Sequence, residues 1–244
     1  MARLDLSLLG PLDVSLAGEP VTAFVSNKVR ALLAYLAVEA DRPHRRDTLA
    51  ALLWPDWPDR SARTNLRNAL ANLRHCVQDR AANPPHLIAS RETIQFNADS
   101  DHWLDVAAFR ALVEADSPDG EWLEEAVALY RGPFLQGFSI GDSPAFEAWA
   151  RLQGEHLRRQ FLDALSQLAE GYLERGEPDK ALDRAQRQLA LDPARESALR
   201  QALREVLLVL HHQDVGRLSL HGSSPPRRLP PDRVRVAVPR PDRG

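Results

Sequence analysis

The segment SARTNLRNALANLRH, Ser61–His75, combines basic and amide side chains with a regular helical spacing. At about 100° per residue, its apolar side chains fall in one stripe that must face a core. That stripe consists of Ala62, Leu66, Ala69, Leu70, Leu73 and Val77. The opposite side, centred on Ala71, carries Arg60, Thr64, Arg67, Asn68, Arg74, His75 and Gln78. This outer face lacks carboxylates and is rich in hydrogen-bond donors, which favours contact with a polyanion.

Other residue types that could do chemistry lack the spacing that chemistry needs. The eight histidines have no companions at metal-ligand spacing, and the single cysteine, Cys76, can form neither an internal disulfide nor the start of a zinc site. Glu124 and Glu125, and likewise Glu170, Glu174 and Glu177, are interpreted as solvated helix faces. No G-x-x-x-x-G-K-[ST] segment is present. The sequence therefore predicts no metal, no cofactor and no enzymatic activity.

Composition and charge are those of a soluble globular protein with two small domains. The chain has 244 residues, of which 44% are hydrophobic and 27% charged, and its formal net charge is −3. Residues 28–80 hold ten basic and six acidic residues, whereas residues 101–210 carry a net charge of −8. The amino terminus is not typical of a signal peptide, and no window approaches 18 consecutive apolar residues. We expect a cytoplasmic protein with no membrane partner.

The first hundred residues predict strands, three helices and a hairpin. Apolar and polar residues alternate twice within residues 4–16, which implies two or three short strands, and helical spacing begins from Ser26. A second helix covers about 46–53, after which Trp54 and Trp57 are expected to close over the core. Asp59 or Ser61 is expected to cap the third helix, and His86–Asn97 reads as a hairpin around a turn at residues 90–93. This order is that of a winged helix with an added sheet, whose third helix enters the DNA major groove and whose hairpin is the wing.

The second half predicts helical hairpins followed by a tail of different composition. Tyr172, Gly176, Ala181, Leu189 and Asp192-Pro193 follow the tetratricopeptide pattern, and such units need a stacked neighbour, so a further hairpin is expected within 105–160. The segment PFLQGF, Pro133–Phe138, is interpreted as a packing loop. Residues 211–244 hold six of the 18 prolines and no aromatic residue, and we expect them to be disordered.

In this order the segments resemble the SARP family of bacterial transcriptional activators. The segments that carry the resemblance are LLGPLDVSLAGEPV, NKVRALLAYLAV, RRDTLAALLWPD, SARTNLRNALANLRHCV, LDVAAFRALV, RGPFLQGF, FEAWARLQGEHLRR and YLERGEPDKALDRAQRQLALDPARE. The resemblance covers roughly residues 1–205. It implies an OmpR-type DNA-binding domain followed by a bacterial transcriptional activator domain, and a protein that binds promoter repeats as paired protomers and recruits RNA polymerase. The chain departs from the family in its wing turn, SRET, which has no glycine, and in its tail, where relatives continue with another helical pair.

The predicted DNA-binding residues divide by the kind of contact they suit. Arg67, Asn68 and Ala71 are candidates for base edges, because arginine pairs with guanine, asparagine with adenine, and a small side chain can meet a thymine methyl. The expected phosphate partners are Arg63, Thr64, Arg74, His75 and Arg91, and Arg60 completes the candidate set. Lys28, Arg45 and Arg46 could also reach the DNA backbone, or could be plain surface residues.

The sequence thus predicts a mostly α fold with small β elements. The domains are an OmpR-type winged helix over 1–98, an all-α tetratricopeptide-like activator domain over 101–210, and the tail over 211–244. The predicted function is sequence-specific regulation of transcription, as an activator that binds double-stranded promoter DNA as a homodimer and recruits RNA polymerase. An alternative stays open, in which the chain is a helical-repeat interaction module with weak or lost operator recognition.

Overall fold

The computed structural model describes residues 2–115 and 120–191 of the chain. It begins with a four-stranded sheet in the order β3-β2-β1-β7, in which β1 pairs antiparallel with β2 and parallel with β7. The strands are β1 (Leu4–Ser7), β2 (Asp13–Leu16), β3 (Glu19–Pro20) and β7 (His102–Leu104). Alternation in β1 buries Leu4 and Leu6, as the period of two in the sequence predicts.

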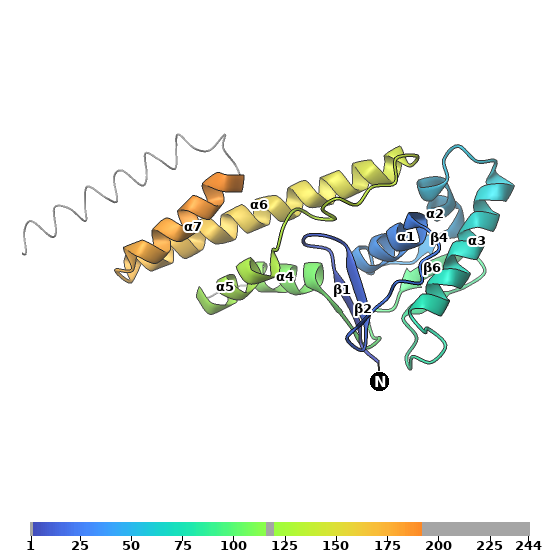
Figure 1. Ribbon diagram of the computed structural model, residues 1–244, viewed down its shortest axis with the longest axis horizontal. Coiled ribbons are helices and arrows are strands. Elements are labelled where there is room, and N and C mark those ends of the chain that lie inside the picture. Colours follow the sequence, from blue (N-terminus) through green and yellow to red (C-terminus); the bar gives the residue numbers. More distant parts are fainter. Residues whose placement is uncertain (1, 116–119, 192–244) are drawn as a thin grey trace, which may run out of the picture. The chain divides into compact units, whose positions relative to one another are not determined.

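Three helices and a second small sheet form the winged helix (Figure 1). The helices are α1 (Asn27–Val38), α2 (Arg46–Leu53) and α3 (Asp59–Cys76). The second sheet has the order β4-β6-β5, with β4 (His44–Arg45), β5 (Leu87–Ala89) and β6 (Thr93–Phe96). Strands β5 and β6 pair antiparallel, which confirms the predicted hairpin and places its turn at residues 90–92.

Two details at the start of α3 differ from the prediction. Neither Asp59 nor Ser61 caps the helix, because α3 already begins at Asp59, and its N-cap residue is Pro58, without a side-chain cap. The amides of Ser61 and Ala62 instead donate to the Pro58 carbonyl. Trp54 is buried as predicted, but Trp57 is 52% exposed, since it lies in the tight turn between α2 and α3 that points its side chain to solvent.

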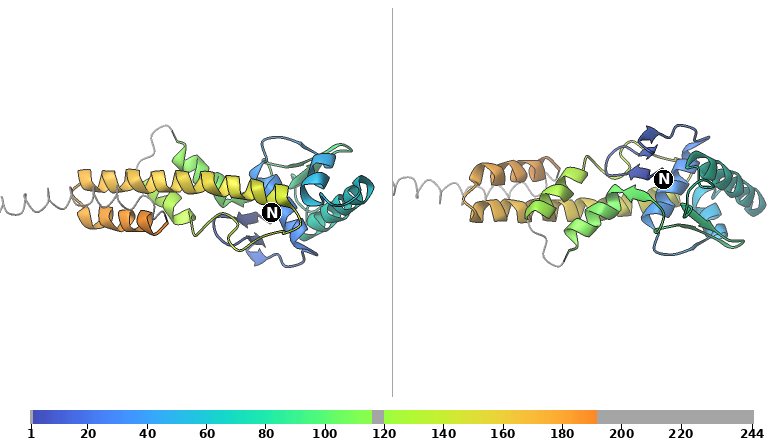
Figure 2. Two further views of the ribbon diagram at one scale, coloured as in Figure 1. Left: turned by 90° about the horizontal axis from the view of Figure 1, so that it is seen from above. Right: turned by 90° about the horizontal axis from the view of Figure 1, so that it is seen from below.

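The rest of the described chain is helical and consists of two stacked hairpins. The helices are α4 (Asp105–Val113), α5 (Gly120–Leu129), α6 (Pro144–Glu174) and α7 (Pro178–Leu191). Helix α7 lies along the second half of α6 in every view (Figure 2). Gly176 has a φ of +71° in the turn between them, and Ala181 and Tyr172 are buried where they meet. The predicted tetratricopeptide-like hairpin and its upstream neighbour are confirmed within the described residues, and Asp192-Pro193 of the predicted pattern lies outside them.

The loop Pro133–Phe138 packs against the amino-terminal sheet, as a packing loop should. Leu9 and Phe134 form an isolated β-bridge, and the Leu135 amide donates to the Leu8 carbonyl at 2.9 Å. Leu135 has a φ of +52°, a conformation that turns the chain without a glycine. A single hydrophobic core runs from the first strand to α7.

The predicted domain boundaries stay predictions. Pairing of β1 with β7 carries backbone hydrogen bonds across the proposed limit near residue 98, and the described residues cluster as one unit. The end of the predicted activator domain and the whole tail, residues 211–244, lie outside the described residues. Of the helices in the described part, none is long and apolar enough to cross a membrane.

Candidate nucleic-acid interface

Helix α3 has two faces that differ sharply in burial. The whole predicted apolar stripe is buried, and Cys76 lies at its edge, 7% exposed. On the outer face Arg60, Arg63, Thr64, Arg67, Asn68, Ala71 and His75 are exposed, and Arg74 is half-buried. The stripe packs on α1 and α2, so the periodicity of the sequence alone orients this helix correctly.

The centre of the outer face is open for contact. In the described part of the chain, neither Arg67 nor Asn68 forms a side-chain hydrogen bond or an ion pair. Ala71, one turn along the helix, is exposed and small. An arginine fork and an amide with unused hydrogen-bonding groups thus lie on one helix face with an exposed methyl group, and these three groups suit base edges in the major groove.

Several of the predicted phosphate partners already have intramolecular partners. Arg63 Nε lies 2.7 Å from Asp47 Oδ1, with both side chains more than half exposed. The Thr64 hydroxyl donates to the Arg60 carbonyl at 3.0 Å. Arg74 Nε lies 3.2 Å from Asp79 Oδ2. An exposed ion pair of this kind is worth little in water, so Arg63 can exchange its carboxylate for a phosphate at small cost.

The wing turn is built on a serine instead of a glycine. Ser90 Oγ accepts hydrogen bonds from the Glu92 and Thr93 amides at 3.1 and 3.0 Å. Arg46 donates from Nε and Nη2 to the Ser90 carbonyl at 3.1 and 2.9 Å, which joins the start of α2 to the turn. Arg91 is left exposed at the tip.

Arginines gather between α2, α3 and the wing. A hollow of about 540 Å³ is lined by Arg45, Arg46, Arg63 and Arg91, together with Asp47 and Glu92. The pKa of Arg46 is lowered, first by burial and then by repulsion from Arg74. One predicted candidate on α3, Arg63, and the predicted candidate on the wing, Arg91, therefore line the same hollow.

Lys28 contacts residues outside the candidate interface. Its ammonium lies 2.7 Å from Asp142 Oδ2 and 5.4 Å from the centre of the Trp54 ring, and the hydrogen bond from Lys28 lowers the pKa of Asp142.

Asn72, which is not among the predicted candidates, holds the segment before α1. It accepts from the Val25 amide and donates to the Ala23 carbonyl, at 3.2 and 3.3 Å. A partner 47 residues away leaves no local signal in the sequence.

Comparison with known proteins assigns the helical half. Residues 104–208 match the model of the bacterial transcriptional activator domain. This part of the chain is therefore similar to the bacterial transcriptional activator domain. This match confirms the resemblance that the eight segments predict.

The relatives of the chain are bacterial regulators. It is 36% identical over 88 residues to the transcriptional regulatory protein EmbR of Mycobacterium tuberculosis, which is 36% of this chain and 22% of EmbR. It is 26% identical over 210 residues to the transcriptional regulatory protein MoaR1 of the same organism, covering 82% of this chain and 65% of MoaR1. The chain thus spans less than two thirds of the length of these relatives.

A solved structure shares the fold. The structure of Mycobacterium tuberculosis EmbR in complex with a low affinity phosphopeptide aligns with a TM-score of 0.53 at 24% identity, covering 86% of this chain and 60% of that one. At this identity the similarity concerns the fold, a winged helix followed by the helical activator domain.

The activator domain is tied to the winged helix near its first residues. Asp105, 1% exposed, accepts hydrogen bonds from the Leu8 and Leu9 amides at 2.7 and 2.8 Å. Burial raises the pKa of this carboxyl group, while the two amides and Arg131 oppose the shift. Further along, Trp149 Nε1 donates to Glu39 Oε1 at 2.9 Å, and the Ser143 hydroxyl donates to the Leu52 carbonyl.

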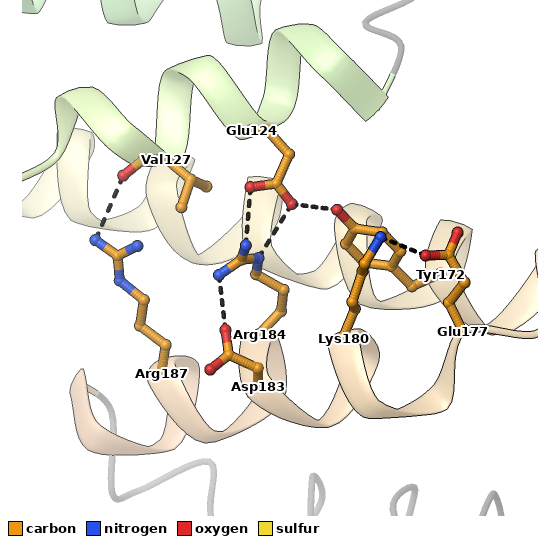
Figure 3. Close-up of polar contacts among 8 residues, drawn as sticks. All are labelled: Glu124, Val127, Tyr172, Glu177, Lys180, Asp183, Arg184 and Arg187. Carbon is orange, nitrogen blue, oxygen red and sulfur yellow. Dashed lines mark hydrogen bonds and ion pairs between the residues drawn. The ribbon is translucent and has the colours of Figure 1, made fainter.

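Within the activator domain, the environment of Glu124 differs from the predicted solvated helix face. It is only partly solvated, with its side chain 31% exposed, and its carboxylate accepts from Tyr172 Oη at 2.6 Å and from Arg184 Nε and Nη2 at 3.1 and 2.9 Å (Figure 3). Arg187 Nη2 donates to the Tyr130 carbonyl at 3.1 Å, just after the end of α5. These contacts join α5, α6 and α7, and their partners are 48 to 60 residues apart, beyond the reach of local pattern.

Proposed function

We propose that the chain is a sequence-specific DNA-binding regulator of transcription, most simply an activator. The relatives are transcriptional regulatory proteins by name, and the activator domain is of the type found in such proteins. Helix α3 enters the major groove, where Arg67, Asn68 and Ala71 meet base edges. Arg63, Arg74, His75 and the wing residue Arg91 bind phosphates on either side.

The observation that carries this proposal is the outer face of α3. It is exposed, lacks carboxylates, and has Arg67 and Asn68 with no internal partner in the described part of the chain. On an ordinary surface helix, such a long face would carry mixed charges with i,i+4 ion pairs. The helical half, with its charge of −8, does not suit DNA and is the part offered to RNA polymerase and to a second protomer.

A binding assay on the complete chain tests this function. Labelled duplexes from the region upstream of its own gene and a shuffled control are titrated at about 50 and about 200 mM salt. We expect tighter binding to one upstream fragment than to its shuffled version, and a loss of affinity with salt that reflects several phosphate contacts. Residues 101–210 alone should show no such preference. If the complete chain binds no duplex at low salt, the helical-repeat interaction module becomes the better assignment.

A further inference from the structure

Asp79 lies immediately after α3 and joins three parts of the winged helix. Its side chain is 6% exposed. Oδ1 accepts from the Leu87 amide at 2.9 Å, at the first residue of β5. Oδ2 lies 3.2 Å from Arg74 Nε, in the last turn of α3, and the Asp79 amide donates to the Arg74 carbonyl at 2.9 Å. One buried carboxylate thus holds the end of α3, the loop and the wing strand together.

Arg74 depends on this carboxylate for its charge balance. The side chain is 37% exposed, but Nε is buried and makes no hydrogen bond. A guanidinium keeps its charge at any ordinary pH, so its buried end needs a counter-charge nearby. Burial and, after it, repulsion from Arg74 lower the pKa of a second cation, Arg46. Loss of the Asp79 charge would leave the buried Nε of Arg74 without its counter-charge.

We propose that Asp79 is a positioning residue that holds Arg74 ready to bind a DNA phosphate. This inference rests on the proposed function. A long side chain that is already fixed by a buried ion pair loses less conformational freedom when it binds, and the remaining guanidinium nitrogens meet the phosphate in a set direction. Asp79 itself does not touch the DNA.

The proposal predicts that loss of the Asp79 charge weakens DNA binding, whereas simple electrostatics predicts that it strengthens binding. Removal of a carboxylate beside a DNA-binding face raises the local positive charge and should strengthen binding to a polyanion. Loss of positioning should weaken it. Asp79→Asn separates the two effects, because it removes the charge but keeps an oxygen that can accept from the Leu87 amide.

Asp47→Asn is the matched control. Asp47 likewise pairs with the Nε of an arginine, because its Oδ1 lies 2.7 Å from Arg63 Nε, but the two side chains are 53% and 59% exposed. An exposed pair does not fix its arginine, so its removal should leave DNA affinity unchanged or raise it. Both variants lose one negative charge from the winged helix.

The experiment uses the complete chain and a labelled 30-base-pair duplex of random sequence, since phosphate contacts do not depend on sequence. We expect Asp79→Asn to weaken binding about 3- to 10-fold and to lower the slope of log K against log salt by about 1, as Arg74→Ala does. Asp79→Asn combined with Arg74→Ala should bind no more weakly than Arg74→Ala alone. Asp47→Asn should bind at least as tightly as the wild type.

Three outcomes would overturn the inference. If Asp79→Asn binds as tightly as the wild type while Arg74→Ala is weakened, Asp79 has no positioning role. If Arg74→Ala itself binds normally, Arg74 does not contact phosphate. If the wild type fails to bind the duplex at low salt, the proposed function fails, which is a separate and recognisable result.

A second variant covers a folding defect. If thermal melts show that Asp79→Asn does not fold, Arg74→Lys tests the pair instead, by a change in the arginine. Lysine keeps the charge but lacks the planar fork, so we expect it to bind the random duplex as weakly as Arg74→Ala. Wild-type affinity for Arg74→Lys would contradict the proposal.

Discussion

His86 shows how much a single buried side chain can weigh on stability. It is 1% exposed, and both of its ring nitrogens lack a hydrogen-bond partner in the described part of the chain. Burial lowers the pKa of its imidazole from 6.5, with His102 acting in the same direction and Asp79 and Asp101 in the opposite one. The neutral ring is therefore the form that the fold accommodates.

This burial predicts a pH dependence of stability. Between the lowered folded-state pKa of His86 and 6.5 the unfolded chain binds more protons than the folded one, so the free energy of unfolding falls as the pH falls through that window. His86→Leu should remove this component. Urea denaturation between about pH 7 and about pH 5 measures it. The exposed His156, changed to Leu, should keep the wild-type slope, and an unchanged slope in His86→Leu would contradict the account.

For single residues, the sequence predicts the solvent exposure of a side chain better than it predicts its hydrogen-bond or ion-pair partner. Periodicity places Arg67, Asn68 and Ala71 on the outer face of α3, because burial on a helix repeats with its turn. It could not show that Arg63 pairs with Asp47, or that Glu124 is bound by Tyr172 and Arg184. Such pairs depend on the tertiary packing of separate elements, and nothing in their local sequence marks them.

Among the elements, the α6–α7 hairpin offers a matched pair of glycines. Gly176 has a φ of +71°, and a methyl group added there would meet no atom within 4 Å, so its only cost is backbone strain. Gly171 lies inside α6, where an added methyl group would meet only the flexible end of Arg175, at 3.3 Å.

The two glycines should therefore respond in opposite directions. Gly176→Ala is expected to destabilise the fold by about 1 to 2 kcal/mol, because alanine resists the left-handed conformation. Gly171→Ala is expected to stabilise it by up to about 1 kcal/mol, because glycine is a poor residue inside a helix. Thermal melts that follow the helical signal in circular dichroism measure the stability of both variants. A stabilised Gly176→Ala would show that the turn is not as described.

Elements with strong periodicity or turn chemistry were predictable, and short long-range pairings were not. The sequence predicts α1, α2, α3, the wing and the α6–α7 hairpin from apolar spacing and a turn glycine. It does not predict β7, three residues long, whose existence depends on pairing with β1 nearly a hundred residues away. Trp57 is misjudged for a similar reason, since the direction of a side chain in a tight turn is set by backbone geometry and not by hydrophobicity.

For the whole molecule, Asp105 is the clearest test of how the activator domain joins the winged helix. Asp105→Ala leaves the buried amides of Leu8 and Leu9 without an acceptor, which should lower the free energy of unfolding by roughly 2–4 kcal/mol. Asp13→Ala, at an exposed position of β2, should change it by less than about 0.5 kcal/mol. Urea denaturation compares them. Equal, small effects would mean that this junction contributes little to stability.

The central claim is that the outer face of α3 reads DNA sequence, and one measurement tests it most directly. The wild-type chain first selects its preferred site from a pool of random duplexes. Affinities for that site and for a random duplex are then compared for the wild type, Arg67→Ala, Asn68→Ala and, as a control away from this face, Arg42→Ala. We expect Arg67→Ala and Asn68→Ala each to lose about 1–3 kcal/mol on the selected site and much less on random DNA, while Arg42→Ala keeps the wild-type ratio between the two. If both α3 variants keep that ratio as well, the face does not read DNA sequence, and the account is contradicted.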